Sequence, residues 1–169
     1  MVVPTFVGLQ GFLVGGQFIV KEFAALSERT ALSHYIFTSP IPWYFLASAD
    51  KSRARWVIRH HRLRWDDGTI PYSKAKSLIT KAVHGTKDDD NDDDDVVVYV
   101  KVHEKRQWNL LLDDERECVY IETLNADYDD IDSLNNLDAD NTMRCGYHYT
   151  NCALQNVFKL FNWWSDNHE

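Results

Sequence analysis

Two cysteines and a histidine near the carboxyl end of the chain have the spacing of a metal site. Cys145, His148 and Cys152 follow the pattern C-x2-H-x3-C within eight residues. Zn²⁺ prefers thiolate sulfur and imidazole nitrogen, held about 2 Å away in a tetrahedron. The spacing therefore indicates a zinc site that takes a fourth ligand from elsewhere in the chain. The alternative is that these are small core residues beside a loop histidine.

One carboxylate interrupts an apolar run near the amino end. Glu22 lies in the middle of residues 17–26, which read QFIVKEFAAL and predict a strand. A buried carboxylate is costly unless it is paired or bound to a metal. Glu22 is therefore a solvent-facing side chain, one partner of a pair, or a metal ligand.

Residues 53–65 are the most basic part of the chain. Arginines alternate there with two tryptophans and two histidines. Arginine beside aromatic rings suits single-stranded nucleic acid, because the cation meets phosphate and the ring stacks on a base. The predicted RNA-binding residues are Arg53, Arg55, Trp56, Arg59, His60, Arg62 and Arg64. The alternative is an amphipathic helix with solvated arginines and core tryptophans.

The elements that must position these residues alternate between strand and helix, so the fold class is α/β. Three early strands with short connections predict an antiparallel meander, and Gly15-Gly16 marks the first turn. The predicted strands are 2–7, 17–26, 31–38, 96–102 and 118–123. One helix is predicted to start within residues 48–51 and to end near residues 60–61, and the others span 72–83, 103–112 and 153–164. The last helix has one broad apolar face, which is typical of packing on a sheet.

The composition predicts a single domain spanning residues 1–169. The formal net charge is −8, but seven aspartates lie in residues 86–95, a predicted flexible acidic insert. No apolar run approaches the length of a membrane span, and the first residues do not resemble a signal peptide. Three cysteines without a disulfide framework favour a reducing, intracellular setting, cytoplasmic or nuclear.

The order of predicted elements resembles the ribonuclease-H-like fold of the DEDD-type 3′-5′ exonucleases. That fold has a mixed central sheet, a three-strand meander plus parallel strands, flanked by helices. Its catalytic carboxylates hold two metal ions. The family's Asp-x-Glu corresponds to Gly8-Leu9-Gln10, and its final His and Asp correspond to Asn151 and Asn156. The resemblance implies a retained fold without two-metal catalysis.

The chain also resembles the Maelstrom domain of small-RNA transposon silencing, a branch of this fold. That domain lacks the catalytic acids and carries a Glu-Cys-His-Cys zinc set. Glu22, Cys145, His148 and Cys152 occur here in the same order. The resemblance implies a structural zinc ion and single-stranded RNA as partner. Two alternatives stay open: a protein-interaction scaffold that binds no RNA, and a metal-independent ribonuclease using His60 and His61.

Overall fold

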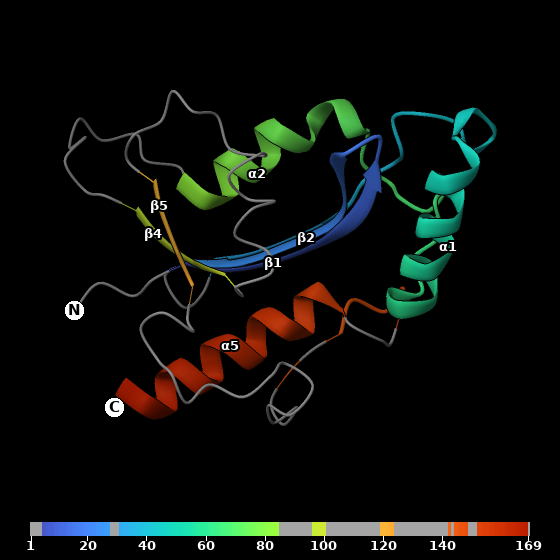
Figure 1. Ribbon diagram of the computed structural model, residues 1–169. Coiled ribbons are helices and arrows are strands. Elements are labelled where there is room, and N and C mark those ends of the chain that lie inside the picture. The colour runs from blue at the N-terminus through green and yellow to red at the C-terminus, as the bar shows by residue number, and fades with distance from the viewer. Residues whose placement is uncertain are drawn as a thin grey trace.

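A mixed sheet between two helices forms the body of the molecule (Figure 1). The computed structural model describes residues 5–27, 31–84, 96–100, 119–123, 142, 144–148 and 152–168. The strands are β1 (Thr5–Val14), β2 (Gln17–Ser27), β3 (Ala31–Ile36), β4 (Val96–Val100) and β5 (Val119–Thr123). The helices are α1 (Ser48–His61), α2 (Ala75–His84) and α5 (Ala153–His168), with 3-10 turns η1 (Trp43–Phe45) and η2 (Tyr72–Lys74).

The strand order in the sheet is β3-β2-β1-β4-β5. The β1–β2 and β2–β3 pairs are antiparallel, whereas β1–β4 and β4–β5 pair in parallel. The predicted α/β class and the antiparallel meander are therefore confirmed. Figure 1 shows α2 and α5 on opposite faces of the sheet, with α1 beyond the end of the β1–β2 hairpin.

The first strand differs from its prediction over residues 2–7. It runs from Thr5 to Val14 and passes through Gly8 and Gly11. The pairing with β2 shifts register between Gln10 and Gly11, which is a β-bulge. A side chain at Gly11 would overlap the Ile19 carbonyl oxygen, so this glycine permits close backbone approach instead of ending the strand. The predicted turn at Gly15-Gly16 is confirmed.

The alternation of side chains along β1 and β2 builds two core layers. On the α2 side the buried cluster comprises Val7, Leu9, Val20, Phe23, Ala25, Phe37, Ala75, Ile79 and Val83. On the α5 side it comprises Phe6, Ala24, Leu26, Cys152, Ala153, Leu154, Val157, Leu160 and Trp164. Glu22 is fully buried. Side chains two residues apart in a strand point to the same face, so Glu22 points to the same side as Ala24 and Leu26. Its carboxylate therefore faces the start of α5.

The three predicted helices that fall within the described residues agree with the structure apart from their ends. α1 lies where a helix is predicted and stops at Arg62, which adopts a left-handed conformation with φ of 63°. The predicted helix over 72–83 is divided into η2 and α2, and α5 extends four residues past Trp164 to His168. The acidic insert 86–95, the helix predicted over 103–112, Cys118 and Asn151 lie outside the described residues. Among the helices that are described, none is long and apolar enough to cross a bilayer.

Candidate metal centre

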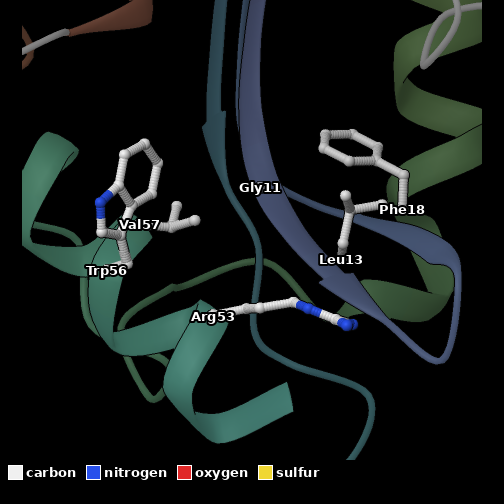
Figure 2. Close-up of a pocket in the computed structure, with 6 residues that line it drawn as sticks. All are labelled: Gly11, Leu13, Phe18, Arg53, Trp56 and Val57. Carbon is white, nitrogen blue, oxygen red and sulfur yellow. The ribbon is translucent and has the colours of Figure 1, made fainter. Parts of the chain in front are cut away.

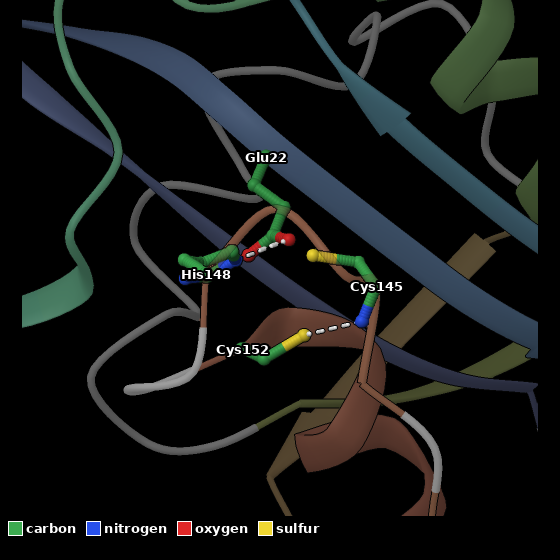
Figure 3. A group of neighbouring side chains, drawn as sticks. All are labelled: Glu22, Cys145, His148 and Cys152. Atoms are coloured by element: carbon green, nitrogen blue, oxygen red, sulfur yellow. Dashed lines mark hydrogen bonds and ion pairs between the residues drawn. The ribbon is translucent and has the colours of Figure 1, made fainter.

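Four side chains from three separate segments meet beneath the sheet (Figure 3). Glu22 comes from the middle of β2, Cys145 and His148 from the segment 144–148, and Cys152 from the residue before α5. One possible ligand atom from each lies within 4.8 Å of all the others. Glu22, His148 and Cys152 are buried and Cys145 is half-buried. The structure therefore brings together all four predicted metal ligands.

The donor set fits a small tetrahedral cation. Two sulfurs, one nitrogen and one carboxylate oxygen form a mixed set of the kind that Zn²⁺ accepts. Bonds of about 2.0 to 2.3 Å in a tetrahedron place neighbouring ligand atoms about 3.3 to 3.8 Å apart. The observed spread of up to 4.8 Å requires only a small contraction around an ion. The residues present therefore fit zinc.

Four hydrogen bonds hold the Glu22 carboxylate. Oε1 accepts from Gln10 Nε2 at 2.8 Å and from the Ala153 N–H at 2.9 Å. Oε2 lies 2.8 Å from both His34 Nε2 and His148 Nε2. Burial by itself raises the pKa of Glu22, but the bonds from His148, His34 and Ala153 outweigh it and lower the pKa to about 2. The carboxylate is therefore ionised and aimed at the site.

His148 is oriented by a main-chain contact. Its Nδ1 lies 2.5 Å from the His61 carbonyl oxygen, which can only accept, so Nδ1 carries a hydrogen. Nε2 then faces Glu22 and is the nitrogen that would bind a metal. Burial lowers the pKa of His148, but the contacts with Cys152 and Glu22 outweigh burial and raise it to about 10. The imidazolium of His148 thus balances the charge of the Glu22 carboxylate.

The two thiols differ in their surroundings. Burial raises the pKa of Cys145 to about 12. Burial also disfavours the Cys152 thiolate, but the hydrogen bond with His148 outweighs it, and the pKa of Cys152 is lowered. The Cys145 N–H donates to Cys152 Sγ at 3.4 Å, which joins the two segments (Figure 3). Both thiols must lose their protons to bind zinc.

The positions predicted to correspond to the exonuclease acids carry no carboxylate wherever the structure describes them. Gly8 lies against the start of α5, where an added Cβ would be 3.2 Å from the Ala153 carbonyl oxygen. Gln10 pairs with Glu22 across the β1–β2 ladder and donates to its carboxylate. Asn156 is half-buried in the first turn of α5. Gln10 therefore supports the metal cluster, and Gly8 permits the close packing of α5.

All seven predicted RNA-binding residues are exposed. The Arg55 guanidinium lies 5.5 Å from the centre of the Trp43 ring, and the Trp56 and His60 ring centres are 3.8 Å apart. Trp65, by contrast, is a core residue, and its indole N–H donates to the Ile41 carbonyl oxygen. The exposed patch thus has one tryptophan, Trp56.

The two adjacent histidines of α1 lie in different environments. His60 is exposed, whereas His61 is only 2% exposed and its Nδ1 accepts the Leu63 N–H. Burial lowers the pKa of His61 to about 4, so its ring is neutral. The structure therefore does not present His60 and His61 together to an RNA strand.

His34 is the contact of this centre that sequence reasoning missed. It lies opposite Ala24 in the β2–β3 ladder, which places it diagonally across from Glu22 on the same face. The sequence signal for this contact was a histidine inside a predicted strand. That signal could be connected to Glu22 only with knowledge of how β3 pairs with β2.

Comparison of the chain with family models, curated proteins and solved structures gives no match.

Proposed function

We propose that this chain is a zinc-stabilised, catalytically inactive exonuclease-like domain that binds single-stranded RNA. The observation that carries the proposal is the cluster of Glu22, Cys145, His148 and Cys152, of which three are buried and Cys145 is half-buried. Four protein ligands leave no open position for water, which is typical of structural zinc. The ion would join the centre of β2 to the start of α5.

The sheet supports a ribonuclease-H-like fold for this domain. An antiparallel meander continues into two parallel strands, with α2 and α5 on opposite faces. Gly8 and Gln10 provide no charge to hold a pair of Mg²⁺ ions. The fold and these substitutions together favour a binding role over two-metal hydrolysis.

The arginines of α1 and of the turn after it support RNA as the partner. Five arginines occur from residue 53 to residue 64, and no acidic residue lies among them. All five are exposed, so they can meet phosphates along a single strand. A role in small-RNA or transposon silencing rests on the Maelstrom resemblance.

Elemental analysis of the purified chain tests the metal. We expect about one zinc per chain, retained in Cys118→Ser and lost in Glu22→Ala and Cys152→Ser. Cys118→Ser is the matched control because Cys118 is the one cysteine that is not among the four predicted ligands. Wild-type protein without zinc, folded as judged by circular dichroism, would contradict the proposal.

Fluorescence anisotropy with labelled single-stranded RNA at several salt concentrations tests the partner. Arg55→Ala, Arg59→Ala and Arg62→Ala together should weaken binding and flatten the salt dependence, because up to three phosphate contacts are lost. The charge-matched control replaces Lys74, Lys76 and Lys81, which are exposed in η2 and α2. If the wild type does not bind RNA at low salt, the protein-interaction scaffold becomes the favoured function. RNA cleavage that persists in a chelator would instead favour the metal-independent ribonuclease.

A further inference from the structure

A cavity of about 340 Å³ opens between the tip of the β1–β2 hairpin and α1. Gly11, Leu13 and Phe18 line it from the hairpin, and Arg53, Trp56 and Val57 line it from the helix (Figure 2). Its volume is at the lower end of the range for small-molecule pockets, about 300 to 1,000 Å³. The cavity is therefore large enough for a planar ring system and too small for a folded segment.

Two of the lining side chains are large apolar groups left in solvent. Trp56 is 62% exposed and Leu13 is 50% exposed. In Figure 2 the Trp56 indole and the Phe18 ring stand on opposite sides of the cavity. Gly11 lines the cavity with main-chain atoms alone. An exposed indole facing apolar side chains is suited to stacking on a flat aromatic group.

The rim of the cavity carries positive charge. Arg53 extends across its edge from α1 (Figure 2). Arg53 also lies 3.5 Å from Asp50, which accepts a hydrogen bond from the Gly15 N–H of the hairpin turn. The Arg53 side chain is 62% exposed, so its long contact with Asp50 is weak enough for a phosphate to replace the carboxylate. Asp50 meanwhile ties the hairpin tip to the start of α1 and keeps the two walls of the cavity together.

We propose that this cavity binds one base of single-stranded RNA, stacked on Trp56, while Arg53 binds an adjacent phosphate. The inference rests on the proposed RNA-binding function and names its base-binding subsite. Charge favours this occupant over an apolar side chain of a protein partner, because the rim leads directly onto the arginines of α1. Stacking on an indole tolerates any base, so the subsite adds affinity with little sequence preference.

Trp56→Ala tests the subsite in the anisotropy measurement with a labelled uridine decamer. We expect binding to weaken about 5- to 150-fold, the range for loss of one base–aromatic stack. The slope of affinity against salt should not change, because no charge is removed. The matched control is Tyr44→Ala, which removes an aromatic side chain that is 73% exposed and outside the cavity. This control should bind RNA as the wild type does.

An oligonucleotide with the same phosphates but abasic sugars separates stacking from charge. Wild type and Trp56→Ala should bind it equally. Photocrosslinking with 4-thiouridine RNA adds a direct readout, since trypsin releases the peptide Trp56–Arg59 and the attached nucleotide should be found on it.

The two hypotheses fail in different ways. If the wild type binds RNA and Trp56→Ala binds equally well, the subsite is wrong and the RNA-binding function stands. The subsite is also wrong if Tyr44→Ala loses as much affinity as Trp56→Ala. If the wild type binds no RNA at low salt, both are overturned and the cavity is left for an apolar group of a protein partner.

Discussion

His148 donates its Nδ1 hydrogen to the carbonyl oxygen of His61, 2.5 Å away and 87 residues earlier in the chain. The bond joins the last residue of α1 to the candidate zinc ligands. It also selects Nε2 as the nitrogen that faces the Glu22 carboxylate. This bond therefore connects the candidate metal ligands to the end of α1, which carries most of the proposed RNA-binding residues.

Removal of the metal should destabilise the whole domain. The four ligands connect β2, the segment 144–148 and α5, so an ion that binds only the folded state adds stability by mass action. We expect a chelator to lower the Tm by about 5 to 10 °C, which corresponds to about 3 kcal/mol in a domain of this size. The Tm of Cys152→Ser should not change when the chelator is added, because this variant has already lost a ligand. An unchanged wild-type Tm after verified zinc loss would argue against a structural role.

Glu22→Ala should destabilise the protein even without zinc. Four donors converge on this fully buried carboxylate, and truncation leaves His34, His148, Gln10 and the Ala153 N–H without their acceptor. The expected loss is about 3 to 5 kcal/mol, the usual result of breaking a buried ion pair. Urea unfolding in a chelator measures it. Asp66→Ala, an exposed control, should change stability by about 0.5 kcal/mol or less. Equal stability of the two variants would be inconsistent with the role given to Glu22.

His34→Ala should weaken zinc binding without changing its stoichiometry. His34 Nε2 contacts Glu22 Oε2 at 2.8 Å and helps to orient the carboxylate. Loss of such an outer contact reduces metal affinity by about 10- to 100-fold. Competition with a chromophoric chelator gives the affinity. Ser33→Ala, the neighbouring residue on β3, is the control and should bind zinc normally. Equal affinities in both variants would show that His34 does not position Glu22.

Tyr72 should make stability fall at alkaline pH. Burial raises the pKa of its hydroxyl, against a smaller opposing effect of its hydrogen bond with the Val20 main chain. The unfolded chain therefore ionises first, near pH 10, and releases protons that the folded state keeps. The contribution of Tyr72 is complete below pH 10 and is lost as pH rises through the folded pKa. Urea unfolding at pH 8 and pH 10.5 should show a larger loss for wild type than for Tyr72→Phe. Tyr44→Phe, at an exposed tyrosine, should behave as the wild type.

The ligand set was predictable from the sequence because residue type and order carry it. Cys145, His148 and Cys152 are close in the chain, and the Maelstrom resemblance supplied Glu22. The meander was predictable because apolar runs and the Gly15-Gly16 turn fix it locally. His34 was missed because its contact with Glu22 depends on the pairing of β3 with β2.

The length of β1 and the apolar cavity could not be obtained from local patterns. Gly8 and Gly11 look like strand breakers, and only the approach of α5 and of the β2 main chain explains them. Leu13 and Phe18 look like ordinary strand residues until the hairpin is placed beside α1. The separate environments of His60 and His61 likewise arise from packing at the end of α1.

Gly11→Ala should show that the glycine in β1 is a requirement of the bulge. The new methyl group would overlap the Ile19 carbonyl oxygen, and main-chain atoms cannot move aside without breaking the β1–β2 ladder. We expect a loss of about 3 kcal/mol in urea unfolding, as for overpacked core sites. Gly8→Ala is the graded control on the same strand, since its Cβ would lie 3.2 Å from the Ala153 carbonyl oxygen and α5 can shift slightly. That variant should lose about 1 kcal/mol. A Gly11→Ala protein as stable as the wild type would mean that β1 and β2 do not approach each other in this way.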